Sequence, residues 1–86
     1  MNIEVYSVKG FTANLLKTKL QEALDKNKIT CSICLINSVD RFIEAGLSSV
    51  PALRIGNKII ENLTEMELDE MIRKAVDFIL EEERRR

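Results

Sequence analysis

The sequence of 86 residues contains no histidine, and it has only one proline and two cysteines. Histidine is the commonest general base near neutral pH and the commonest metal ligand, so its absence removes the simplest catalytic pairs. Two cysteines alone supply half the ligands of a structural zinc site, and no histidine is present to complete it. We therefore expect no bound metal and no cofactor.

The chain also has no excess of charge of one sign and no long apolar run. Thirteen Lys and Arg residues against fourteen Asp and Glu residues give a net charge of −1, which argues against a broad basic surface for nucleic acid. The N-terminal residues lack the basic and apolar regions of a signal peptide, and no segment is long enough to cross a membrane. These patterns predict a single domain over residues 1–86. We expect it in the cytoplasm, a compartment in which free thiols are normal.

The first half of the chain predicts a strand, a helix and a second strand. Residues 3–8 alternate between apolar and polar side chains, the period of a strand. From Thr12 to about Lys26 the apolar residues return at helical spacing, with Thr12 as the N-cap. Residues 29–36 are β-branched and cysteine-rich with almost no charge, which favours a buried strand. The apolar face of the helix consists of Phe11, Leu15, Leu16, Leu20, Ala23 and Leu24.

The second half predicts a short helix, a hairpin and a long helix. The short helix begins at an N-cap Ser38 and ends at Gly46, with Val39, Phe42 and Ile43 as its apolar face. Residues 52–55 and 58–60 form a hairpin closed by Gly56-Asn57. In the last helix, Thr64 to Glu67 is a capping box and Leu63 with Leu68 is a hydrophobic staple. The order βαβαββα predicts an α/β fold with a four-stranded mixed sheet and helices on both faces.

Two segments carry a resemblance to a known family. Residues 3–7 resemble the first strand of the small thioredoxin/glutaredoxin-like proteins of prokaryotes, and residues 42–53, which end in Gly-Leu-Ser-Ser-Val-Pro-Ala-Leu, resemble the segment that carries their conserved proline. The similarity covers nearly the whole chain and implies a thioredoxin-like domain. It also implies a cis Val50–Pro51 bond.

The resemblance places Phe11 and Asn14 at the two positions of the reactive cysteines. Neither side chain can form a mixed disulfide, so the family's dithiol chemistry is not expected. The resemblance also implies the surface with which proteins of this family dock extended peptides, and the loss of the cysteines leaves that surface intact. We therefore expect a protein or peptide partner. Phe11 either anchors that partner as an exposed side chain or packs under the helix, and both readings stay open. The surface would consist of Lys9, Gly10, Phe11, Thr12, Ser49, Val50 and Pro51.

Cys31 and Cys34 match the Cys-x-x-Cys spacing of redox proteins, but they lie in a predicted strand. Residues three apart in a strand point to opposite faces and lie about 10 Å apart, whereas a disulfide needs Cα atoms within about 7 Å. The pattern favours two buried, unreactive thiols. The alternative is a divergent thiol-disulfide oxidoreductase that uses Cys31 or Cys34. A third hypothesis is a homodimer built on an edge strand, so we expect a monomer or a weak homodimer.

Overall fold

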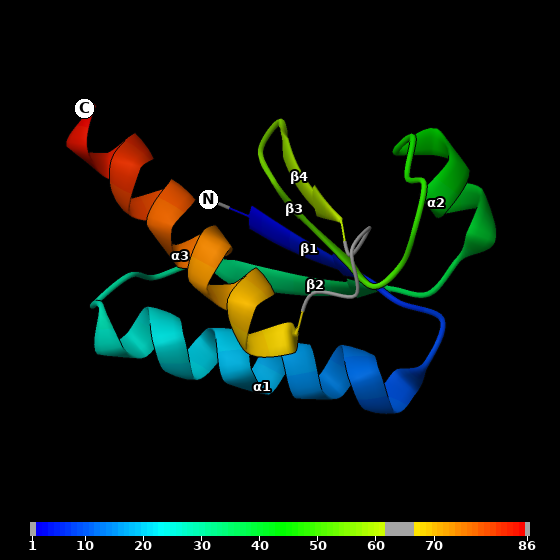
Figure 1. Ribbon diagram of the computed structural model, residues 1–86, viewed down its shortest axis with the longest axis horizontal. Coiled ribbons are helices and arrows are strands. Elements are labelled where there is room, and N and C mark those ends of the chain that lie inside the picture. Colours follow the sequence, from blue (N-terminus) through cyan, green and yellow to red (C-terminus); the bar gives the residue numbers. More distant parts are fainter. Residues whose placement is uncertain (1, 62–66, 86) are drawn as a thin grey trace.

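The structure is a computed structural model that describes residues 2–61 and 67–85. Strands and helices alternate in its first half, and a hairpin and a long helix complete it (Figure 1). In chain order the elements are β1 (Asn2–Tyr6), α1 (Gly10–Lys26), β2 (Ser32–Ile36), α2 (Val39–Glu44), β3 (Ala52–Ile55), β4 (Lys58–Glu61) and α3 (Leu68–Arg84).

The strands form one four-stranded sheet in the order β2-β1-β3-β4. β1 and β2 are parallel, whereas β3 runs antiparallel to both β1 and β4. Tyr6 at the end of β1 lies beside Ile36 at the end of β2 and Ala52 at the start of β3. The α/β class, the mixed sheet and the hairpin predicted from the sequence are confirmed. Because β1 and β2 are parallel, the loops that follow them emerge at the same end of the sheet.

One face of the sheet carries the main core. Ile3 and Val5 of β1 and Leu53 of β3 are fully buried there, beneath the helices α1 and α3, which lie together on this side (Figure 1). The core residues that the helices supply recur at helical spacing. They are Leu16, Leu20 and Leu24 of α1 with Met71, Ile72, Ala75, Val76 and Ile79 of α3.

Among the described residues, α2 covers the opposite face, and it does so at one end. There Phe42 packs edge-on against Tyr6, with ring centroids 5.9 Å apart, next to Ile36 and Ala52. Farther along the same face, the carboxylate of Glu4 lies 3.5 Å from the guanidinium of Arg41 and 3.7 Å from that of Arg54. This half of the face therefore carries charged side chains that α2 leaves in contact with solvent.

The structure corrects the predicted start of α1 and the length of two strands. α1 begins at Gly10 with Lys9 as its N-cap, so Thr12 lies inside the first turn and is not the N-cap. β1 ends at Tyr6 and β2 begins only at Ser32. Hydrophobic periodicity located these elements correctly, but it extended the strands into connecting segments that contain buried residues such as Ile29.

The predicted start of α3 is also wrong. Glu67 has an extended backbone, with φ −68° and ψ 152°, and it is the N-cap of a helix that begins at Leu68. A capping box from Thr64 would require Glu67 to be helical. Leu63, Thr64 and the predicted staple contact lie outside the described residues.

α2 has a smaller buried face than its sequence predicts. Phe42 is buried, but Val39 and Ile43 are 62% and 71% exposed. The end of the helix is as predicted, because Gly46 has φ +72° and the amide of Leu47 donates to the carbonyl of Phe42. A single side chain therefore supplies the buried face of α2.

Candidate functional site

The segment between β1 and α1 is held by the buried side chain of Ser7. Its Oγ accepts a hydrogen bond from the amide of Lys9 at 3.3 Å and donates to the carbonyl of the same residue at 3.2 Å. The carbonyl of Lys9 also accepts the first helical hydrogen bond, from the amide of Ala13. No side chain caps the N-terminus of α1, and its first turn contains no acidic residue. The amides of this turn therefore point outward without a side-chain partner among the described residues.

The segment before β3 is held by Glu61 of β4. One carboxylate oxygen of Glu61 accepts hydrogen bonds from the amides of Ser48 and Ser49, at 2.7 Å and 2.9 Å. The Val50–Pro51 bond that follows is cis. Hydrogen bonds to a charged acceptor are stronger than those between neutral groups, so Glu61 fixes this loop against the sheet. Sequence reasoning missed this role, because it depends on the pairing of β3 with β4.

These two segments enclose a small hollow of about 180 Å³. Four of the predicted binding residues line it together, namely Lys9, Thr12, Val50 and Pro51. Two further lining residues, Ser7 and Val8, belong to the strand predicted over residues 3–8 but follow the end of β1 in the structure. The other predicted residues, Gly10, Phe11 and Ser49, do not line the hollow.

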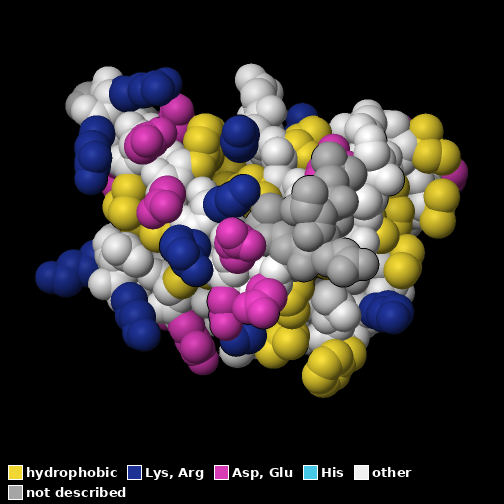
Figure 2. All heavy atoms as spheres, in the orientation of Figure 1, with side chains coloured by type: hydrophobic (Ala, Val, Ile, Leu, Met, Phe, Trp, Pro, Cys, Tyr) yellow, Lys and Arg dark blue, Asp and Glu magenta, His cyan; other side chains and the backbone are white. Residues whose placement is uncertain are grey.

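Exposed apolar side chains gather at the same end of the sheet. Val8 is 53% exposed and Phe11 is 82% exposed, so Phe11 belongs to the surface and not to the apolar face of α1. Val39 and Ile43 of α2 are the other two large hydrophobic side chains that are exposed among the described residues. All four follow the ends of β1 or β2. Figure 2 shows hydrophobic side chains along the margin formed by α2 and the start of α1.

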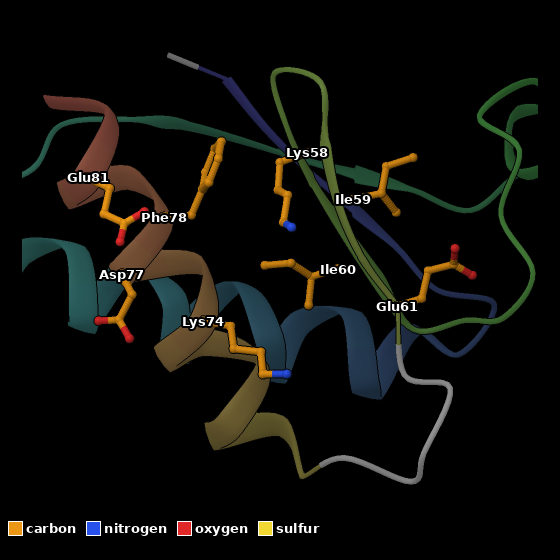
Figure 3. A pocket seen from close by; sticks show the side chains of 8 residues that line it. All are labelled: Lys58, Ile59, Ile60, Glu61, Lys74, Asp77, Phe78 and Glu81. Atoms are coloured by element: carbon orange, nitrogen blue, oxygen red, sulfur yellow. The ribbon is translucent and has the colours of Figure 1, made fainter. Parts of the chain in front are cut away.

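A second hollow, of about 410 Å³, lies between β4 and α3 (Figure 3). Phe78 and Ile60 provide its apolar lining. Charged side chains of both signs surround them, and they include Lys58 of β4 with Lys74, Asp77 and Glu81 of α3. Figure 3 shows Glu61 pointing away from α3. In residues 2–61 and 67–85 no three acidic or cysteine side chains are grouped as they would be around a metal ion. The described residues that line this hollow include no cysteine, serine or threonine.

The two cysteines lie on different faces of the sheet. Cys31 is half-buried and packs against the main core, whereas Cys34 is exposed on the opposite face beside Glu4 and Arg54. The prediction of two buried thiols is therefore wrong for Cys34. A strand alternates its side chains, and β2 begins at Ser32, so the sulfur of Cys34 reaches solvent on the side that α2 leaves open.

We expect alkylation to distinguish the two thiols. Burial raises the pKa of the Cys31 thiol, so less of the reactive thiolate forms at Cys31 near neutral pH. Iodoacetamide should modify Cys34 first, as peptide mass spectrometry over a time course would measure. Cys31→Ser should keep the fast phase and Cys34→Ser should lose it. Equal rates at both thiols would contradict this assignment.

Alkaline pH should lower the free energy of unfolding through Tyr6. Burial raises the pKa of Tyr6 above its usual value of 10.0, and the hydrogen bond from its hydroxyl to Glu4, 2.9 Å long, adds to this rise. The unfolded chain releases this proton near pH 10 while the folded chain retains it, so stability falls as pH rises above about 10. Urea unfolding from pH 8 to 11 should show this loss, and Tyr6→Phe should reduce it. An unchanged pH dependence in Tyr6→Phe would exclude Tyr6 as its source.

Comparison of the chain with protein-family models, with curated proteins and with solved structures gave no match. In the part of the chain that the structure describes, no helix has the length and apolar character needed to cross a membrane.

Proposed function

We propose that this chain is a thioredoxin-like domain that binds an extended peptide or protein segment and catalyses no dithiol exchange. The element order βαβαββα and the mixed sheet support this assignment, together with the resemblance of residues 42–53 to the family's proline segment. Binding takes place at the end of the sheet where β1 and β2 finish and β3 begins.

The observation that carries the proposal is the clustering of exposed apolar side chains at this end. The four large hydrophobic side chains that are exposed in the described residues all follow β1 or β2, and the hollow beside Pro51 is lined by the segment that follows β1, which includes Val8. Exposed apolar side chains that gather in one region support an interaction site there. A peptide would place an apolar side chain against Phe11 and Val8.

The backbone of the peptide would contact the start of α1. In the described part of the chain no side chain caps the first amides of this helix, and the exposed Lys9 stands beside them. Such amides bind carbonyl or carboxylate oxygens. The site therefore combines an apolar anchor with donors for a peptide backbone, as peptide-recognition domains do.

The competing hypothesis, an oxidoreductase that uses Cys31 or Cys34, has less support. Exchange within a Cys-x-x-Cys pair needs both sulfurs on one side of the chain, whereas these two lie on different faces of the sheet. At the family's cysteine positions, Phe11 has no reactive group and the amide of Asn14 donates to the carbonyl of Gly10.

The proposal predicts that Phe11→Ala weakens peptide binding without affecting the fold. Peptides selected from a random display library against the wild-type domain provide the probe, and fluorescence anisotropy gives the Kd. An aromatic anchor contributes about 1 to 3 kcal/mol, so Kd should rise by a factor of about 5 to about 150. The melting temperature should stay the same, because the ring is 82% exposed.

Thr18→Ala is the matched control, since Thr18 is exposed two turns farther along α1. It should leave both the Kd and the melting temperature unchanged. Selected peptides that bind Phe11→Ala as tightly as the wild type would remove this surface as the binding site.

A further inference from the structure

β2 is an edge strand with no charged residue. The strand order places β2 and β4 at the two edges of the sheet. β4 begins with Lys58 and ends with Glu61, and charges of this kind keep edges from pairing with other chains. In contrast, no Lys, Arg, Asp or Glu occurs between Lys28 and Asp40. The edge formed by β2 lacks the usual protection.

The outward side of β2 presents backbone groups that can pair. The amide of Ser7 donates to the carbonyl of Ile36 at 3.1 Å, so the backbone groups of Ile36 face β1. Backbone groups alternate along a strand, and those of Cys34 therefore also face β1, while those of Ile33 and Leu35 face away. Among the described residues no strand pairs with this outward side.

We propose that β2 pairs antiparallel with β2 of a second copy of this chain, with Cys34 of each copy at the centre. This register pairs all five residues of the strand. It sets Ile33 opposite Leu35 of the second copy, and the outward backbone groups of both form the hydrogen bonds. The two Cys34 residues then form the pair without hydrogen bonds, whose Cα atoms lie about 4.5 Å apart. Both sulfurs lie on the exposed face.

The charges beside β2 favour a second copy as the partner. Lys28 precedes the uncharged run and Asp40 follows it, and both side chains are exposed. Antiparallel pairing sets the basic end of each strand beside the acidic end of the other. Within the strand no like charges meet, and the half-buried Ile33 and Leu35 extend the apolar face of the sheet across both copies.

Sedimentation equilibrium of the full chain under reducing conditions tests this pairing. The wild type and Cys34→Ser should show a mass of twice 9.8 kDa at high concentration. Cys34→Lys and Cys34→Glu each place two like charges opposite one another, so the dimer dissociation constant should rise about fivefold or more. An equimolar mixture of these two variants should dimerise again. A monomeric wild type, or charged variants that dimerise as well as the wild type, would overturn the proposal.

Oxidative cross-linking gives a test that needs no charged variant. Diamide takes two electrons and two protons from a pair of thiols and leaves a disulfide. Wild type and Cys31→Ser should form a covalent dimer rapidly, since Cα atoms about 4.5 Å apart permit a disulfide. Cys34→Ser should not. The control is Cys34→Ser combined with Thr18→Cys, whose exposed thiol lies outside the interface. Cross-linking of that control as fast as the wild type would contradict the register.

Discussion

Phe42→Ala is expected to lower the free energy of unfolding by about 3–5 kcal/mol, the cost of removing a buried phenylalanine. Phe42 is the buried residue of α2, and its ring packs edge-on against Tyr6, 5.9 Å between centroids. Without it, α2 has no apolar contact of comparable size with the sheet. Because domains of this size have only about 5–15 kcal/mol of stability, the variant should unfold at a much lower urea concentration.

Ile43→Ala is the control, because it shortens the neighbouring side chain of the same helix, which is 71% exposed. It should shift the urea midpoint only slightly. Far-ultraviolet circular dichroism during urea unfolding measures both variants. A Phe42→Ala protein as stable as Ile43→Ala would show that α2 contributes little to the fold.

The long helix α3 and the short helix α2 show what hydrophobic spacing can and cannot predict. α3 spans 17 residues, so apolar positions at helical spacing recur often enough to identify one face, and its five buried residues follow that spacing. α2 spans only six residues, less than two turns. In so short a segment Val39, Phe42 and Ile43 all fit one face, and only packing against Tyr6 decides which is buried.

The candidate site was predictable in part. The family resemblance brought the segment at Lys9 and the segment at Pro51 together, and both line the hollow. The predicted start of α1 is wrong because Thr12 is a typical N-cap residue, whereas the N-cap in the structure is Lys9, whose amide donates to the side chain of Ser7. The contact of Glu61 with the loop before β3 depends on strand register, which local sequence does not encode.

The exposure of Cys34 was missed for a related reason. Low charge and β-branched neighbours predict a strand buried on both faces. β2 has those features, yet α2 covers only the end of the sheet near Tyr6, and the face beyond Glu4 stays open. The extent to which a helix covers a sheet depends on the whole chain. It cannot be predicted from the sequence of the covered strand alone.

Leu16→Ala is expected to cost about 2–5 kcal/mol, because Leu16 is fully buried in the main core and its removal leaves a cavity. Leu16 also lies one turn after Thr12, so it fixes the first turn of α1 against the sheet. The loss of stability should therefore be accompanied by weaker binding of the peptides that depend on Phe11. Urea unfolding and fluorescence anisotropy below the unfolding transition measure the two effects separately.

Leu15→Ala makes the same chemical change one position earlier, where the side chain is only half-buried. The sequence placed Leu15 and Leu16 on one apolar face, whereas the structure separates them. We expect Leu15→Ala to cost about 1 kcal/mol or less, in proportion to the smaller apolar area that it buries. Equal losses in the two variants would mean that α1 is rotated relative to the sheet, and Phe11 would then no longer be placed at the surface beside the hollow.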